Sequence, residues 1–128
     1  MDYFSSNSML LMERSMNYLW TKQAAISDNI ANAETPNYKA KIVTFEESLR
    51  EKIEQALHSS KPRSNLRETL ENSEFAVITT QDSHRLDDNG VNTTEQMVEL
   101  VRNAYQLQYV MNAISTDLST LRTAINGK

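Results

Sequence analysis

The sequence predicts a mainly α-helical protein, with a long helix at each end of the chain and a short helix and a small irregular or β segment between them. Apolar residues near both ends recur at alternating spacings of three and four. This is the rhythm of a heptad repeat and favours helices that pair as a coiled coil or bundle. The 128 residues include two glycines and two prolines, fewer than many turns and strands would require. A chain of this length suits one folding unit, predicted as residues 1–128.

The N-terminal helix is predicted over residues 8–33. It is expected to end there because the ring of Pro36 disfavours helical geometry at Thr35 and removes a backbone donor. Six of the seven positions on its stripe are apolar, and the stripe consists of Met9, Met12, Met16, Leu19, Gln23, Ile26 and Ile30.

The middle region, residues 34–91, has weaker patterns. A short amphipathic helix is predicted over 45–57, where apolar residues recur at every fourth position. The polar, proline-containing stretch 58–65 is predicted to be a loop, with a brief turn at 66–70. Residues 75–80 are rich in β-branched side chains, which favours a short strand, but the sequence identifies no partner strand for it.

The C-terminal helix is predicted over residues 92–126 and carries the strongest pattern in the chain. A turn at Asn89-Gly90 precedes it, and Asn92 and Glu95 are the pair expected to cap its first turn. Its stripe keeps the alternating spacing without a break through Met97, Leu100, Ala104, Leu107, Met111, Ile114, Leu118, Leu121 and Ile125.

The two stripes are predicted to be assembly seams. A stripe confined to a and d positions is typical of a coiled coil, whereas a core-facing helix usually has a wider apolar face. The seams can pair within one chain, as in an ordinary helical hairpin, or each can pair with another copy, and the pattern leaves both open. The residues predicted to form the assembly seams are Met12, Met16, Leu19, Ile26, Ile30, Met97, Leu100, Leu107, Met111, Ile114, Leu118 and Leu121.

Signals for catalytic, cofactor or metal sites are weak throughout the sequence. The absence of cysteine excludes thiolate chemistry and cysteine-based zinc sites. His58 and His84 lie near serines, but no third group is placed to orient either, so exposed side chains are expected. The segment with Gly90 at the sixth position does not match the calcium-binding loop pattern, because Arg85 occupies the first ligand position and Gln96 the last. We therefore expect no catalytic residue, cofactor or metal, and the net charge of −4 argues against nucleic-acid binding.

No stretch of the sequence has the pattern of a membrane span or a cleavable signal peptide. The first residues lack a positively charged region and an apolar core, and no later stretch approaches the roughly 20 apolar residues of a spanning helix. Taken alone, these features predict a cytoplasmic protein or one that is exported without a cleaved signal.

One segment, Asn29 to Ala40, is more specific than the periodicities. It resembles the N-terminal signature of the bacterial flagellar rod and hook protein family, in which an Asn-Ile/Leu-Ala-Asn run closes the first helix and a Thr-Pro-x-Tyr turn follows. The matching residues are Asn29, Ile30, Ala31, Asn32, Thr35, Pro36 and Tyr38. The segment from Asn89 through Met97 to Asn103 is similar to the C-terminal signature of the family, although Gln96 stands where that family often has an acidic residue.

Details of the match point to the proximal rod. Asn37 precedes Tyr38 here, whereas hook and distal-rod relatives more often have glycine at that position. The small size and the absence of a Tyr-Pro-Asn tripeptide before the last helix favour one of two proximal-rod subgroups, with the other as an alternative. The resemblance covers both ends of the chain and leaves the middle region unmatched.

The resemblance implies a structural subunit of the proximal rod of the flagellar basal body, in the periplasm, exported by the type III apparatus of the flagellum without a cleaved signal peptide. Its implied partners are other rod subunits, the adaptor at the rod base, the basal-body membrane ring and the export apparatus. No nucleic acid, small-molecule substrate or direct membrane insertion is expected. Asn29 and Asn32 are expected to form hydrogen bonds at a helix end and between helices, with simple surface capping as the alternative.

Two other functions stay open on the residues alone. A cytoplasmic helical adaptor or chaperone would use the same seams for a homo-oligomeric bundle, and it would form stable, fully helical oligomers at low concentration. An enzyme would need polar groups clustered in a pocket of the middle region, and the sequence shows no such cluster.

Overall fold

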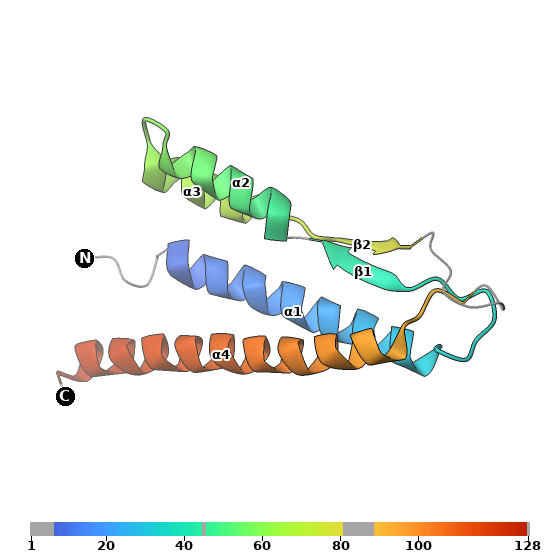
Figure 1. Ribbon diagram of the computed structural model, residues 1–128. Helices are drawn as coiled ribbons and strands as arrows, with labels where there is room; N and C mark the ends of the chain where they lie inside the picture. The colour runs from blue at the N-terminus through green and yellow to red at the C-terminus, as the bar shows by residue number, and fades with distance from the viewer. Residues whose placement is uncertain (1–6, 45, 81–88, 128) are drawn as a thin grey trace. The chain divides into compact units, whose positions relative to one another are not determined.

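The computed structural model describes residues 7–44, 46–80 and 89–127 (Figure 1). Along the chain, a long helix at each end flanks a middle region with two short helices and a small sheet, which confirms the predicted fold class. The elements in chain order are α1 (Asn7–Ala31), β1 (Lys41–Thr44), α2 (Glu46–Leu57), α3 (Pro62–Glu71), β2 (Ala76–Thr79) and α4 (Thr93–Asn126).

Contacts divide the chain into two compact units. The first, called here the helical unit, contains the described residues of 1–17, 46–73 and 107–128. The second, called the sheet unit, contains those of 18–45 and 74–106. Both long helices contribute to both units, so neither unit is a continuous stretch of sequence, and the single unit predicted over residues 1–128 stays a prediction.

The ends of α1 and α4 follow local rules of helix termination. The chain leaves α1 through two turn-type bonds, in which Ala33 N donates to Ile30 O (3.2 Å) and Thr35 N to Asn32 O (3.0 Å). At the start of α4, Asn92 Oδ1 accepts a bond from Glu95 N at 3.3 Å, as an N-cap side chain does. At the other end, Gly127 takes φ +66°, the left-handed conformation that commonly stops a helix.

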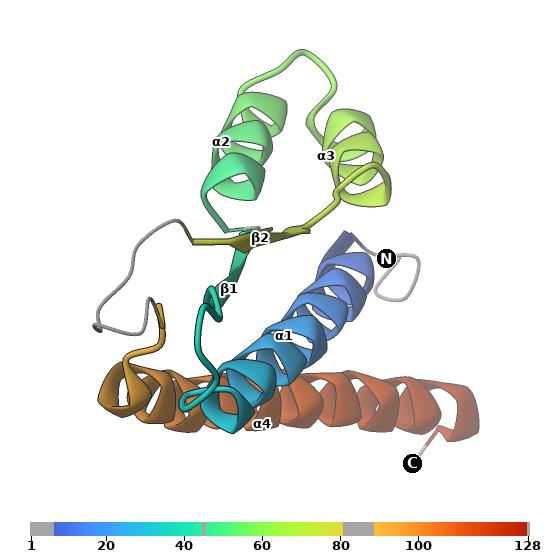
Figure 2. The ribbon, with the colours of Figure 1, turned by 90° about the vertical axis from the view of Figure 1, so that its right-hand side faces the viewer.

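Within the helical unit, α2 and α3 lie side by side (Figure 2). Leu49 and Ala56 of α2 are buried, and Leu70 of α3 is 1% exposed. In the connection between the helices, Asn65 Nδ2 donates to Ser59 Oγ at 2.8 Å, and Ser59 Oγ donates to Ala56 O at 2.6 Å. Apolar packing and a short polar connection therefore hold this hairpin together.

The predictions of a loop at 58–65 and a brief turn at 66–70 were wrong, because α3 occupies Pro62–Glu71. Pro62 lies in the first turn of α3, where a backbone N–H has no helical partner and proline therefore starts a helix without penalty. An ion pair between Arg67 and Glu71 (2.8 Å), one helical turn apart, supports the same helix.

Within the sheet unit, β1 and β2 form an antiparallel pair (Figure 1). The register places Lys41 opposite Thr79 and Thr44 opposite Ala76. The strand predicted over 75–80 corresponds to β2. The strand that pairs with it, which the sequence did not identify, is β1. Edge-to-face contact between Tyr18 and Phe75, with ring centroids 6.3 Å apart, connects α1 to the residue that precedes β2.

Candidate assembly interface

The family signature forms a hydrogen-bonded junction in the sheet unit, with Asn29 at its centre. Asn29 has no exposed surface. Its Nδ2 donates to Lys41 O and to Gln96 Oε1, both at 2.9 Å. Its Oδ1 accepts from Lys41 N at 2.8 Å and from the Tyr38 hydroxyl at 3.2 Å. An amide side chain has two N–H donors and an oxygen that can accept two hydrogen bonds, and in Asn29 all four are used. These bonds connect the end of α1 to β1 and to α4.

The turn after α1 is closed by Asn32 and Asn89. Asn32 Nδ2 donates to Asp28 O at 2.8 Å, and Asn32 Oδ1 accepts from Thr35 Oγ1 at 3.1 Å. Asn89, which is fully buried, donates through Nδ2 to the carbonyls of Asn32 (3.0 Å) and Thr35 (2.6 Å). Asn89 Oδ1 also accepts from Val91 N at 2.8 Å. The segment that leads into α4 is therefore fastened to the turn that ends α1.

Small apolar residues fill the space beside this junction. Ala33, Ala40 and Val91 form a buried cluster, and Tyr38 packs against it. Burial raises the pKa of the Tyr38 hydroxyl, while the charge of Lys41 acts in the opposite direction and that of Asp28 adds to the rise. Larger side chains at the two alanine positions would not fit without displacing the turn.

The backbone conformation of Asn37 restricts which residues can precede Tyr38. It has φ +60°, the left-handed region that glycine adopts freely and asparagine tolerates better than most residues. This conformation accounts for asparagine at position 37 of this chain.

A second polar contact joins α1 and α4 inside the sheet unit. Asn103 is fully buried, and its Nδ2 donates to Leu19 O at 3.0 Å and to Gln23 Oε1 at 2.7 Å. An ion pair between Lys22 Nζ and Glu99 Oε2 at 3.5 Å lies on the same pair of helices. Gln23, the polar member of the predicted N-terminal stripe, therefore meets a polar partner on α4 rather than an apolar one.

Burial separates the predicted seam of α4 into two rows, each spaced by seven residues. Leu107 is buried, and Leu100, Ile114 and Leu121 are half-buried. The other row is exposed, with Met111 at 52% and Leu118 at 51%, and it consists of Met97, Ala104, Met111, Leu118 and Ile125. One row of the seam is therefore covered within the chain, and the other row is exposed among the described residues.

On α1, the predicted seam residues are mostly covered. Leu19 and Ile26 are buried, and Met12, Met16 and Ile30 are half-buried. Neighbouring Trp20, which the stripe did not include, is 55% exposed.

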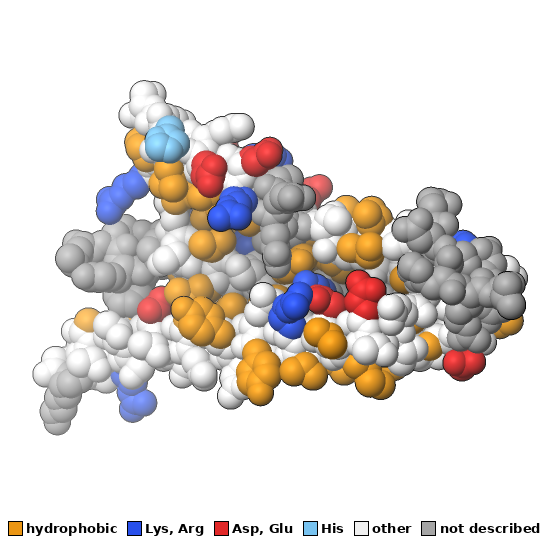
Figure 3. Space-filling model, in the orientation of Figure 1, with side chains coloured by type: hydrophobic (Ala, Val, Ile, Leu, Met, Phe, Trp, Pro, Cys, Tyr) orange, Lys and Arg blue, Asp and Glu red, His pale blue; other side chains and the backbone are white. Residues whose placement is uncertain are grey.

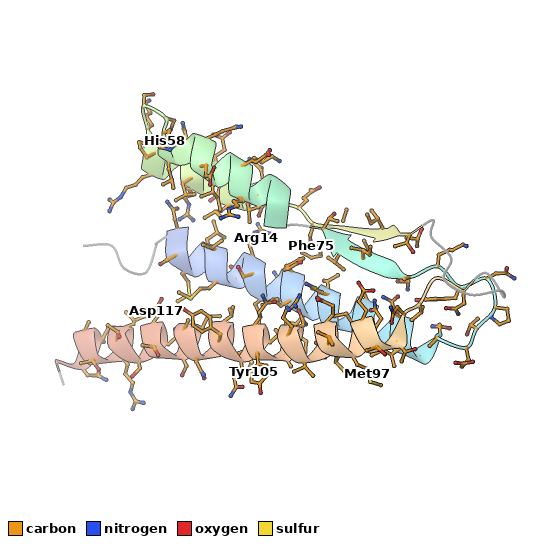
Figure 4. All side chains as sticks on the ribbon, in the orientation of Figure 1. Arg14, His58, Phe75, Met97, Tyr105 and Asp117 are labelled. Carbon is orange, nitrogen blue, oxygen red and sulfur yellow. The ribbon has the colours of Figure 1, made fainter. Side chains whose placement is uncertain are left out.

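A further apolar surface, which the heptad pattern does not predict, lies next to the open row of α4. In the sheet unit it comprises Val98, Val101 and Tyr105, which lie beside Met97 of the open row, and these four side chains are 53% to 70% exposed. Met97 and Tyr105 point away from α1 (Figure 4), and hydrophobic side chains gather along α4 in the space-filling view (Figure 3). Contiguous exposed apolar side chains on a helix mark a surface for protein contact.

Other features predicted from the sequence have little structural support as chemical sites. His58 is exposed, at the end of α2. His84 and Arg85 lie outside the described residues. Among the described residues, no three acidic or histidine side chains are grouped so that they can hold a metal ion. No described helix is both long enough and apolar enough to cross a membrane.

Known proteins match this chain at the junction and over most of its length. A sequence profile of the family described as "Flagella basal body rod protein" matches residues 13–39, which include the whole junction segment from Asn29 to Tyr38. The "Flagellar basal body rod protein FlgB" of Bacillus subtilis (strain 168) is 27% identical over 125 residues, 95% of this chain and 95% of that protein. The FlgB of Borrelia hermsii is 33% identical over 106 residues, 75% of this chain and 78% of that protein.

The subgroup favoured by the missing Tyr-Pro-Asn tripeptide was FlgB, with FlgC as the alternative. Both relatives bear the name FlgB, and one of them extends over nearly the whole chain. The match therefore includes the middle region, which the resemblance of the two ends did not reach. The chain belongs to the FlgB family of flagellar basal body rod proteins.

Proposed function

We propose that this chain is a structural subunit of the proximal rod of the flagellar basal body and that it assembles along the rod axis through α1 and α4. Membership of the FlgB family supports the rod role. The observation that carries the mode of assembly is the open row of the α4 seam, from Met97 to Ile125, together with the exposed surface beside it.

Exposed apolar residues of this kind are stabilised when a partner covers them. Fully burying a leucine or methionine side chain contributes about 1.5–3 kcal/mol relative to leaving it in water. The row contains three such side chains, Met97, Met111 and Leu118, each about half exposed in the single chain. A neighbouring subunit that covers the row would recover a substantial part of that free energy.

The signature residues act in this proposal as a scaffold and not as contact residues. Asn29 and Asn89 are buried and bonded within the chain, so they have no surface to offer a partner. They fix the end of α1 to the start of α4, and hence determine which side of α4 remains open. The seam can bind a neighbour only if this junction sets the orientation of the helix first.

The partners follow from the proposed position. They are other rod subunits, the adaptor at the rod base, the membrane ring of the basal body and, during delivery, the type III export apparatus of the flagellum. The location is then the periplasmic rod, and the contribution to motility is mechanical. No cofactor and no substrate enter this function.

The test is to purify hook–basal bodies from the host and probe them for the tagged chain by immunoblot. The proposal predicts that the full-length protein co-purifies and that deletion of residues 97–125 abolishes the signal. Detection in the cytoplasm alone, as a stable and fully helical oligomer at low concentration, would instead support the adaptor or chaperone function.

A further inference from the structure

The two edges of the small sheet differ in their hydrogen bonding. In an antiparallel pair, residues whose backbone groups face the partner strand alternate with residues whose groups face outward. Thr80 N donates to Ala40 O at 2.8 Å, which extends the ladder and fixes the alternation. Ile42 with Ile78, and Thr44 with Ala76, are therefore the pairs that bond to each other. The residues with outward backbone groups are Lys41 and Val43 on β1, and Val77 and Thr79 on β2.

The outer edge of β1 is covered by side chains of α1. Asn29 takes both groups of Lys41, as donor to its carbonyl (2.9 Å) and acceptor from its N–H (2.8 Å). The hydroxyl of Tyr18 donates to Val43 O at 3.5 Å. This edge is therefore closed to any further strand.

The outer edge of β2 has no such cover. Within the described part of the chain, no hydrogen bond reaches the outward groups of Val77 or Thr79. All four residues of β2 are exposed, with Val77 at 50% and Ile78 at 47%. Edge strands are usually protected by a charged residue or a proline, and β2 has neither.

We propose that β2 pairs antiparallel with β2 of a second copy of this chain, giving a continuous sheet of four strands. An uncharged strand meets no electrostatic repulsion from a copy of itself, and the covered edge of β1 leaves β2 as the strand edge that the described part of a second copy can offer. Three or more strands are also needed before a small sheet becomes stable by itself.

The positions of the outward groups select one register. Val77 bonds to the partner's Thr79 and Thr79 to the partner's Val77, which uses all four open backbone groups. Ile78 then faces the partner's Ile78 across the two-fold axis as a non-hydrogen-bonded pair, with Cα atoms about 4.5 Å apart. A closed two-fold pair cannot extend into a polar rod, so this dimer is a state of the chain outside the assembled rod.

The test uses the absence of cysteine in the natural sequence. Ile78→Cys places one thiol at the predicted axis, within the range of about 4.4–6.8 Å between Cα atoms in which disulfides form. Val77→Cys is the matched control, because the two substituted residues of a dimer are then offset along the strands, beyond this range. Mild oxidation of the purified full-length chain should give several times more covalent dimer with Ile78→Cys. Equal yields from the two variants would overturn the proposed register.

A second measurement does not depend on the cysteine variants. The unmodified chain should show a monomer–dimer equilibrium in analytical ultracentrifugation, and Thr79→Pro should shift it several-fold toward monomer because it removes an outward N–H donor. An unmodified chain that stays monomeric at every concentration, or a proline variant that dimerises equally well, would refute the pairing. Neither result bears on rod incorporation through α4, which is tested separately in purified basal bodies.

Discussion

Different kinds of contact stabilise the interior of the sheet unit and the interior of the helical unit. Among the described residues, the largest fully buried side chains of the sheet unit are the asparagines Asn29, Asn89 and Asn103, whereas that of the helical unit is Leu70. Hydrogen bonds require a particular side chain at a particular place, while apolar packing accepts any residue of similar volume. This difference explains why the junction carries a recognisable signature and the α2–α3 hairpin does not.

Asn29→Ala should produce the largest loss of stability. It leaves both backbone groups of Lys41, the Tyr38 hydroxyl and the Gln96 side chain without their partner, and each unsatisfied buried group costs about 1–3 kcal/mol. We expect a loss of about 4 kcal/mol in the free energy of unfolding, measured by urea denaturation. Asn32→Ala is the control, with an expected loss of about 1 kcal/mol because Asn32 is half-buried.

Hydrogen exchange shows whether the effect is local to the sheet unit. With Asn29→Ala, amides of residues 38–44 and 89–91 should exchange faster, while those of α2 and α3 stay protected. A uniform increase over both units would mean that the junction and the hairpin are not separable, and the contrast between the units would be lost.

Leu70→Ala tests the same contrast from the helical unit. A buried leucine replaced by alanine typically costs 2–5 kcal/mol, and we expect about 3 kcal/mol here because Leu70 is almost fully covered. Leu70→Met should cost less than about 1.5 kcal/mol, since packing tolerates a residue of similar size. If methionine were as damaging as alanine, the hairpin would depend on a specific shape and not on apolar volume.

Asn37 tests the backbone of the turn with a smaller expected effect. Asn37→Val should cost about 1–2 kcal/mol, because a β-branched residue adopts φ +60° with difficulty. Asn37→Gly should stay within about 0.5 kcal/mol of the natural chain, since glycine adopts that conformation freely but loses more entropy on folding. Thermal unfolding of the two variants compares them directly, and equal melting temperatures would show that the left-handed conformation is not required.

The smallest expected effect is a dependence on alkaline pH. The pKa of Tyr38 is raised, chiefly by burial, and that of Lys41 is raised, chiefly by its hydrogen bond to Asp28. A raised pKa means that the protonated form is favoured in the folded state, so the stabilisation is fully present below the unfolded pKa and is lost as the pH rises through the folded value. Stability should therefore decline above about pH 10, and Tyr38→Phe should reduce the slope. An unchanged slope would remove Tyr38 as a source of the decline.

The sequence predicted the long helices well because their signals are local and repeated. The heptad stripes, the Asn92 cap and the proline after α1 all act within a few residues of each other. It failed for α3, where Pro62 was interpreted as a loop residue although proline is also favoured in the first turn of a helix. It also failed for β1, although Ile42, Val43 and Thr44 are as rich in β-branched side chains as the strand that was predicted at 75–80.

The candidate site could be predicted in part. The two signatures included Asn29, Asn32, Asn89 and Asn103, but not the partners of the last two, whose Nδ2 atoms donate to residues more than 50 positions away in the chain. Periodicity also predicted the apolar stripe of α4, but not which of its two rows is buried within the chain. No local pattern contains that information.

The most direct measurement of the central claim is rod incorporation of Leu118→Asp against Ser119→Asp. Both positions are exposed on α4, so neither change should alter folding by more than about 0.5 kcal/mol, but only Leu118 belongs to the open row of the seam. Immunoblots of purified hook–basal bodies should detect Ser119→Asp at the natural level and little or no Leu118→Asp, because a neighbour would bury its unpaired charge. Normal incorporation of Leu118→Asp would contradict assembly through this row.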